Sequence, residues 1–214
     1  KIALINPKGE QTLDKKMKFF WEGISSQFLR QSLSGCSSAL LVLAGLTPKS
    51  YKVKLIDENF EKIDFNERHD LIAISMMTQQ ACRAYEVADV FRKKGDKVVI
   101  GGIHATVLPN EAKEHADSVV MGEAEGIWNK VLEDTRNNSL KPFYISEKPV
   151  DLAKSPMPRY DLLRKEYYNI IWVQTTRGCP IDCEFCAASK VFGLKPRHKT
   201  IRQVVKGIKF IKNL

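Results

Sequence analysis

Short apolar segments alternate with helical segments along the first ~137 residues, and this order limits the chain to a few folds. Small or apolar side chains recur at helical spacing over residues 81–91, and Gly95 is a plausible end for that helix. Further helices are expected over residues 27–46, 110–116 and 127–137. Apolar strands joined by helices favour a parallel sheet that is covered on both faces. We therefore predict a doubly wound α/β fold of the Rossmann or flavodoxin-like type, with strands over residues 2–5, 53–56, 71–75, 98–100 and 118–121.

A proline-rich stretch interrupts this alternation over residues 140–169. Four prolines fall within 17 positions of it, so we interpret the stretch as a linker and residues 1–139 as the first domain. A second domain is expected over residues 170–214, with a strand at 170–174 and a final helix after a capping box at Thr200. Both ends of the chain fall inside an apparent element. We therefore expect a segment of a longer protein, with a second domain cut off after its first βα unit.

Composition says more about the cellular compartment of the chain than about what the chain binds. The 34 basic and 25 acidic residues give a net charge of +9, but they are scattered, so we interpret most of them as solvated surface and a nucleic-acid partner as the less favoured alternative. The longest uncharged apolar run, residues 39–46, has eight residues, whereas a membrane span needs about 20. Five cysteines, three of them within eight residues, indicate a metal site in a reducing compartment. With no signal peptide at its start, the chain is expected to be cytoplasmic.

The strongest chemical signal is the spacing of Cys179, Cys183 and Cys186, which follows the pattern Cys-x3-Cys-x2-Cys. Three thiolates on one short loop can each hold one iron of a [4Fe-4S] cluster and leave the fourth iron open to a substrate. A structural zinc site is the alternative, with His198 as a fourth ligand, but closed zinc sites favour paired Cys-x2-Cys spacing. We call this pattern the cysteine motif, and it favours a cluster.

The cysteine motif, with Phe185 before its last cysteine and Arg-Gly-Cys-Pro at its start, resembles the cluster loop of radical S-adenosylmethionine enzymes. The resemblance implies that Cys179, Cys183 and Cys186 ligate a [4Fe-4S] cluster whose open iron is chelated by S-adenosylmethionine. It also implies an external electron donor, and radical formation or methyl transfer in which the cofactor carries the chemistry. Phe185 would pack near the adenine or shield the cluster, with ordinary loop packing as the alternative. Since few residues follow Cys186, we expect the segment to lack a whole catalytic barrel and to be inactive alone.

Small and hydroxyl-bearing residues gather where the predicted strands end, which is where doubly wound sheets bind their ligands. Gly-Gly-x-His-x-Thr follows the fourth strand and Gly-Glu-x-Glu follows the fifth, ahead of the cysteine motif. This order resembles the cobalamin-binding domain of B12-dependent radical S-adenosylmethionine proteins, and with the cysteine motif the resemblance spans nearly the whole chain. It implies that the residues around the corrin or its nucleotide tail are Ser75, Thr78, Gly101, Gly102, His104, Thr106, Gly122, Glu123 and Glu125.

Simpler interpretations stay open for several of these residues. The double glycine can serve a tight exit from a strand, the two glutamates can favour the start of the next helix, and His104 can cap a loop. The Asp-x-His-x-x-Gly signature that supplies a lower-axial histidine is missing, so we do not assign His104 to cobalt. We expect the lower face of a bound cobalamin to be water-bound, empty or blocked by Met76 or Met77.

These observations predict an enzyme: a cobalamin-dependent radical S-adenosylmethionine protein that transfers a methyl group or performs other radical chemistry on an unreactive carbon. Its substrate, a small or lipid-like molecule, and its catalytic residues are not identified by this sequence. A transfer-RNA methylthiotransferase is the runner-up, but that family places three further cysteines in its first domain, and here only Cys36 and Cys82 are present. A non-catalytic cobalamin-binding module is the third alternative.

Overall fold

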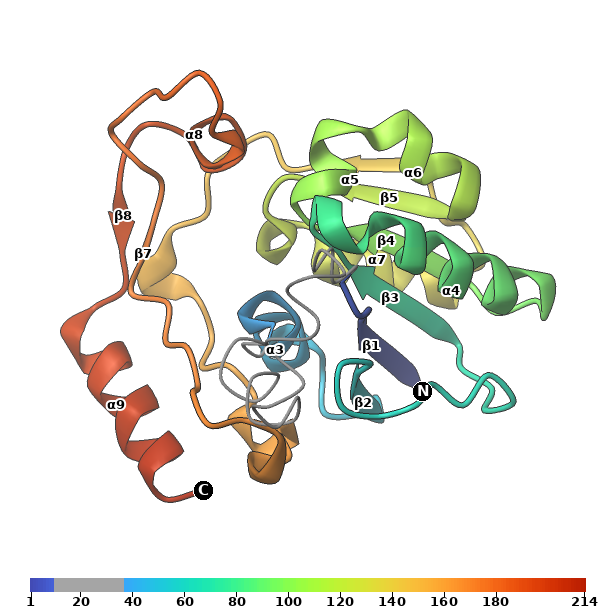
Figure 1. The fold of residues 1–214 in the computed structure, drawn as a ribbon, viewed down its shortest axis with the longest axis horizontal. Coiled ribbons are helices and arrows are strands. Elements are labelled where there is room, and N and C mark those ends of the chain that lie inside the picture. The colour runs from blue at the N-terminus through green and yellow to red at the C-terminus, as the bar shows by residue number, and fades with distance from the viewer. Residues whose placement is uncertain (10–36) are drawn as a thin grey trace, which may run out of the picture.

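The computed structural model describes residues 1–9 and 37–214, and a parallel sheet lies at its centre (Figure 1). The six strands are β1 (Ile2–Asn6), β2 (Val53–Asp57), β3 (Leu71–Ser75), β4 (Val98–Gly101), β5 (Ser118–Met121) and β6 (Phe143–Ile145). Their order in the sheet is β2-β1-β3-β4-β5-β6, and every neighbouring pair is parallel. All five predicted strands are confirmed, and so is the doubly wound α/β fold class.

Helices cover both faces of this sheet. One face carries α4 (Ala81–Lys93), α5 (Ile103–Val107) and α6 (Pro109–His115), and the other carries α3 (Ser38–Leu46) and α7 (Trp128–Arg136). The second half of the helix predicted over residues 27–46 is confirmed by α3, whereas residues 27–36 lie outside the described residues.

Alternation along the strands supplies the two cores. In β3, Ile72 and Ile74 pack in the core that contains Phe91 of α4, whereas Leu71 and Ala73 pack in the core that contains Trp128 of α7. Successive side chains of a strand point to opposite faces, so a strand buried on both sides must be apolar throughout. This is why the predicted strands were recognisable as short, mostly apolar runs, with Lys54 as an exception in β2.

The sixth strand lies in the stretch that the sequence analysis interprets as a linker. It has three residues, too few for a recognisable pattern, and it pairs with β5 so that Val120 lies opposite Tyr144. Tyr144 is buried, and its hydroxyl donates a hydrogen bond of 2.6 Å to Oδ2 of Asp134 in α7. The sheet therefore extends beyond residue 139. Its last strand lies in residues that we interpret from the sequence as a linker because of their prolines.

The structure corrects the second predicted unit at its first strand. Residues 170–175 have no regular secondary structure, and the strand there is instead β7 (Thr176–Arg177), which pairs antiparallel with β8 (Arg197–His198). A strand needs a hydrogen-bonded neighbour, and the described part of the chain offers none beside residues 170–174. The strand predicted over residues 170–174 from their apolar side chains is therefore wrong.

Two helices complete the chain, α8 (Ala187–Phe192) and α9 (Ile201–Lys212). The predicted capping box is confirmed, because Oγ1 of Thr200 accepts the Gln203 N–H at 3.2 Å and Oε1 of Gln203 accepts the Thr200 N–H at 2.8 Å. We call residues 176–199 the cysteine segment, and Figure 1 shows it on the side toward which the carboxyl ends of the strands point. Across residues 1–9 and 37–214, no helix is both long enough and apolar enough to cross a membrane.

Candidate functional site

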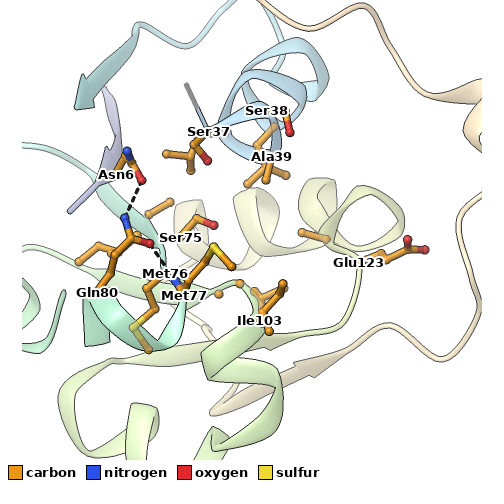
Figure 2. A pocket seen from close by; sticks show the side chains of 18 of the residues that line it. Asn6, Ser37, Ser38, Ala39, Ser75, Met76, Met77, Gln80, Ile103 and Glu123 are labelled. Atoms are coloured by element: carbon orange, nitrogen blue, oxygen red, sulfur yellow. Dashed lines mark hydrogen bonds between the residues drawn. The ribbon is translucent and has the colours of Figure 1, made fainter. Parts of the chain in front are cut away.

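A cavity of about 570 Å³ lies at the carboxyl ends of β1, β3, β4 and β5. Its apolar part includes Ala73 and Trp128, and its polar part includes the side chains of Ser75 and Gln80. Figure 2 shows the start of α3 on one side of the cavity, with Ser75 and Met77 facing it and Ile103 further across. This volume lies in the range of small-molecule and cofactor sites. The site therefore lies where a doubly wound sheet is expected to bind its ligand.

The cavity is bounded by the cysteine segment as well as by the sheet. Gln174, Arg177, Val191 and Phe192 are among its lining residues, although they are distant in sequence from the strand ends. The helix α8 lies against α5, which brings Val191 and Phe192 to the cavity. One space is thus shared by the two parts of the chain that carry the two sequence signals.

Glycines shape the cavity wall by letting loops approach one another. Gly102 has a φ of +101°, and a Cβ atom there would lie 2.4 Å from the backbone oxygen of Met76. Gly122 has a φ of +78°, in the left-handed region that favours glycine. Both residues line the cavity, as does Gly101. The structure thus supports the tight-exit interpretation of the double glycine while placing it at the predicted site.

Thr106 joins the two glycine loops instead of lining the cavity. Its hydroxyl donates to the Gly102 carbonyl oxygen at 2.8 Å and accepts the Gly122 N–H at 3.0 Å. This contact holds the ends of β4 and β5 at a fixed separation. The threonine of the Gly-Gly-x-His-x-Thr sequence therefore supports the cavity wall from behind.

His104 and Thr78 also lie outside the cavity lining. The His104 ring is buried, with Nδ1 at 3.2 Å from the hydroxyl of Thr78 and Nε2 at 3.3 Å from Oε1 of Glu111. Hydrogen bonds from Tyr85 and His104 lower the pKa of Glu111 below its ordinary value. Both ring nitrogens of His104 are engaged within the protein, so the structure gives this histidine a role in holding helices α4, α5 and α6 together.

Glu123 and Glu125, by contrast, line the cavity and form ion pairs with arginines of the cysteine segment. Arg177 places Nη1 2.9 Å from Oε1 of Glu123 and Nη2 2.7 Å from Oε1 of Glu125. Arg197 places Nη1 2.7 Å from Oε2 of Glu123 and Nη2 2.9 Å from its Oε1. We call these four residues the charge bridge. It joins the β5 loop to both strands of the β7–β8 pair.

Glu123 and Arg177 form the buried centre of the charge bridge, and both stay ionised. Burial opposes the charge on Glu123, but hydrogen bonds from Arg197, the Val150 N–H and Arg177 hold its pKa below the ordinary value. Burial likewise opposes the charge on Arg177, while its pairing with Glu125 and Glu123 raises its pKa. The Nε atom of Arg177 is buried and has no hydrogen-bond partner among the described residues.

The three motif cysteines lie in the cysteine segment as free, half-buried thiols. Cys179 donates its N–H to Gly193 O at 3.1 Å, and Cys186 donates to Cys183 O at 3.1 Å. Among the residues that the structure describes, no three His, Cys, Asp or Glu side chains are grouped closely enough to hold a metal ion. The donor set still fits an iron–sulfur cluster in its chemistry, since three thiols on one loop are what such a cluster binds. The ligand assignment therefore continues to rest on spacing.

Other residues of the cysteine segment and the β3 end differ in exposure. Phe185 is 93% exposed, so its ring is not packed within the loop, and its place near the adenine or the cluster stays a prediction. Met76 is buried in the core, whereas Met77 is 48% exposed and lines the cavity. Both methionines suggested for the lower face of cobalamin line the cavity, Met76 from the core and Met77 from the exposed loop.

Some cavity residues were missed by sequence analysis. Asn6 accepts a hydrogen bond of 3.1 Å from the Gln80 side chain, which also accepts the Met77 N–H at 2.9 Å, and this fixes the β1 and β3 loops together (Figure 2). Ser37 and Ser38 line the cavity from the start of α3. They fall inside the helix predicted over residues 27–46, and nothing in the sequence marked them as cavity residues. Asn6, in contrast, ends a predicted strand and could have been found by that criterion.

The cavity fits a corrin in its chemistry. A corrin is a broad, largely apolar ring with amide substituents, and the cavity combines Ala73, Val99 and Val120 with hydroxyl and amide side chains. The glycine loops add backbone to its lining at Gly101 and Gly122. The residues present are therefore suited to such a ligand.

Comparisons with known proteins agree with this geometry. The B12 binding domain family matches residues 37–132. The chain is 39% identical over 172 residues to bacteriochlorophyllide d C-8(2)-methyltransferase of Chlorobaculum tepidum, covering 74% of this chain and 37% of that protein. It is 32% identical over 174 residues to bacteriochlorophyllide d C-12(1)-methyltransferase of the same organism, covering 78% and 38%. The chain thus spans less than two fifths of the length of these relatives.

The fold is also found in a solved structure. The radical S-adenosylmethionine methyltransferase TsrM of Kitasatospora setae, with cobalamin and a [4Fe-4S] cluster bound, aligns with a TM-score of 0.65 at 15% identity. The alignment covers 99% of this chain and 45% of that one. At this identity the likeness establishes a shared fold across the sheet and the cysteine segment.

Proposed function

The chain belongs to the B12-binding radical S-adenosylmethionine proteins, and on that premise we propose that it is the cofactor-binding part of a cobalamin-dependent methyltransferase. The observation that carries the proposal is the position of the cavity. It lies between the carboxyl edge of the sheet and the cysteine segment, and both line it. A corrin in this cavity would face the segment that carries Cys179, Cys183 and Cys186.

Each cofactor would be held by a different kind of group. The hydroxyl of Ser75, the backbone of Gly101 and Gly122, and the Met77 side chain are available to a corrin in the cavity. The three motif thiols would hold a [4Fe-4S] cluster, with S-adenosylmethionine as its further ligand. When bound, these cofactors supply methyl-carrying and one-electron chemistry that no side chain can perform. The apolar wall around Trp128 would exclude water from the cavity.

The proposed reaction is transfer of a methyl group to an unreactive carbon, with an external electron donor reducing the cluster. Two of the relatives are named for methylation of bacteriochlorophyllide d, so a tetrapyrrole is the first substrate class to test. A small or lipid-like molecule of another class is the second.

One anaerobic ultraviolet–visible spectrum tests the proposal. The purified chain is reconstituted with iron, sulfide and hydroxocobalamin and is then desalted. We expect the absorption of both an iron–sulfur cluster and a corrin to remain with the protein. A corrin without a cluster would favour a non-catalytic cobalamin-binding module, and a cluster without a corrin would contradict the role of the cavity.

Cysteine variants separate the cluster from the rest of the fold. Cys183→Ala should abolish cluster absorption and iron content while leaving corrin uptake unchanged. Cys82→Ala is the matched control, because Cys82 is an exposed free thiol on α4 outside the motif. Unchanged iron content in Cys183→Ala would refute the ligand assignment.

A cavity variant tests the corrin in the same way. Ala39 is exposed at the start of α3 and lines the cavity, so Ala39→Trp fills space without entering a core. We expect loss of corrin uptake with the cluster retained. Ala153→Trp is the control, since Ala153 is also exposed and lies outside the cavity lining.

A further inference from the structure

The charge bridge places four charged residues in one buried contact. Glu123 is 5% exposed and Arg177 is 9% exposed. Charges in such surroundings interact far more strongly than they do in water, and removal of either partner leaves the other only partly compensated. The contact is therefore specific to one arrangement of the two chain parts that it joins.

The β7–β8 ladder explains why two arginines meet there. Arg177 and Arg197 are direct partners in its register. Like charges opposite each other on a ladder repel, so this pair requires the two carboxylates that it contacts. Arg197 also donates to the carbonyl oxygens of Val150 and Phe192 at 2.7 and 2.8 Å. Both ends of the loop that carries the three cysteines are thus held by the same glutamate, Glu123.

The glutamates belong to the cavity as much as to the bridge. Glu123 follows Gly122 directly, Glu125 lies two residues further on, and all three residues line the cavity. The Gly122 N–H is held by Thr106, so the β5 loop has little freedom to move away from a ligand. The loop whose carboxylates contact the cysteine segment is thus part of the cavity wall.

We propose that Arg177 and Arg197 are positioning residues and that the charge bridge couples the cavity to the cysteine segment, so that a ligand in the cavity orders the loop carrying Cys179, Cys183 and Cys186. The inference rests on the proposed function, which supplies cobalamin as that ligand. Coupling between two sites is reciprocal. A cluster assembled on the loop therefore raises the affinity of the cavity for cobalamin by the same factor.

Hydrogen exchange of the iron-free protein tests this coupling without activity. Backbone exchange is measured by mass spectrometry with and without hydroxocobalamin. In the native protein we expect hydroxocobalamin to slow exchange at the ends of β3, β4 and β5, and to slow it about tenfold across residues 176–199. The readout is the change caused by the ligand, which a residue needed only for folding does not alter selectively.

Variants at Arg197 assign the effect to the charge bridge, because Arg197 does not line the cavity. In Arg197→Met, hydroxocobalamin should still protect the strand ends but no longer protect residues 176–199. Arg197→Lys should restore part of that protection, since it keeps the charge and loses the paired geometry. Arg159→Met is the matched control: its bidentate pair with Asp161 is exposed and lies outside the cavity lining.

The outcomes separate this inference from the proposed function. Protection of residues 176–199 that persists fully in Arg197→Met would overturn the inference, because direct contact with the ligand would then suffice. Protection of the strand ends alone in the native protein would also overturn it while leaving cobalamin binding intact. Absence of protection at every site would refute cobalamin binding itself.

Discussion

The sheet domain and the cysteine segment each supply part of one cavity, but they hold their parts in different ways. The sheet fixes its loops by backbone contact, as where Gly102 packs against Met76 and Thr106 joins two strand ends. The cysteine segment has one two-residue ladder and one short helix, and the charge bridge secures it from outside. The comparison teaches that the pocket is formed by the fold itself, whereas the position of the motif cysteines depends on a few charges.

The largest effect should come from the backbone contact in the sheet domain. Gly102→Ala places a Cβ atom 2.4 Å from the Met76 oxygen at a positive φ, and should lower the free energy of unfolding by about 3 kcal/mol or more. Urea unfolding followed by tryptophan fluorescence measures the loss. Gly126→Ala is the control, since nothing lies within 4 Å of a Cβ atom there. If both variants lost the same free energy of unfolding, the close contact of Gly102 with the Met76 backbone would not be what fixes the cavity wall.

A smaller loss is expected at a buried hydroxyl. The indole N–H of Trp128 donates to Oγ1 of Thr47 at 2.9 Å. Thr47→Val leaves that donor unsatisfied and should cost about 1–3 kcal/mol in urea unfolding. Thr135→Val is the control, because Thr135 also donates to the carbonyl four residues earlier but accepts no buried donor. If the control lost as much stability, the effect of Thr47→Val would come from its bond to the Leu43 carbonyl oxygen and not from the Trp128 N–H.

Acid should loosen the cysteine segment before it unfolds the sheet. Hydrogen bonds from Arg197 and Arg177 outweigh burial and hold the pKa of Glu123 below its ordinary value of 4.5. The stability from this lowered pKa is complete above 4.5 and is lost as the pH falls through the pKa of the folded state. Hydrogen exchange across residues 176–199, corrected for intrinsic rates, should therefore rise below pH 4.5 while that of β3 stays slow.

Glu123→Gln is the check on this assignment. It should show the loosened segment already at neutral pH, with a weaker further change on acidification. If acid loosened the segment as steeply in this variant as in the native protein, another group would be responsible.

The smallest effect is expected at the helix that follows the segment. Thr200→Ala removes the cap that accepts the Gln203 N–H and should destabilise α9 by about 1 kcal/mol, measured by its hydrogen exchange. Ser37→Ala at the N-cap of α3 is the control, because Ser37 makes no side-chain cap hydrogen bond. If Ser37→Ala destabilised α3 as much as Thr200→Ala destabilises α9, the side-chain cap hydrogen bond would not be the source of the effect.

The fold was largely predictable because buried parallel strands leave a direct mark on the sequence. Each of the five predicted strands is a short apolar run that packs on both faces. The failures have the same origin. Strand β6 is too short to leave that mark, while residues 170–174 carry it without having a neighbouring strand.

The candidate site was predictable in place but not in detail. Sequence order shows which residues follow a strand, so Ser75, Gly101 and Gly122 were found at the cavity. It does not show which way a side chain turns, and His104 and Thr106 turn toward neighbouring loops. The partners of Glu123 lie 54 and 74 residues away in the chain. Only the folded arrangement reveals that these carboxylates join the two regions.

The antiparallel pairing of Arg177 with Arg197 has a consequence for how such proteins can diversify. Because both ends of the intervening loop meet at one ladder, residues added at its exposed positions leave its end points unchanged. A loop from a relative could therefore be grafted between these two arginines, bringing new chemistry to the cavity while the scaffold remains unaltered. The ladder fixes the two end points of the loop, whichever residues lie between them.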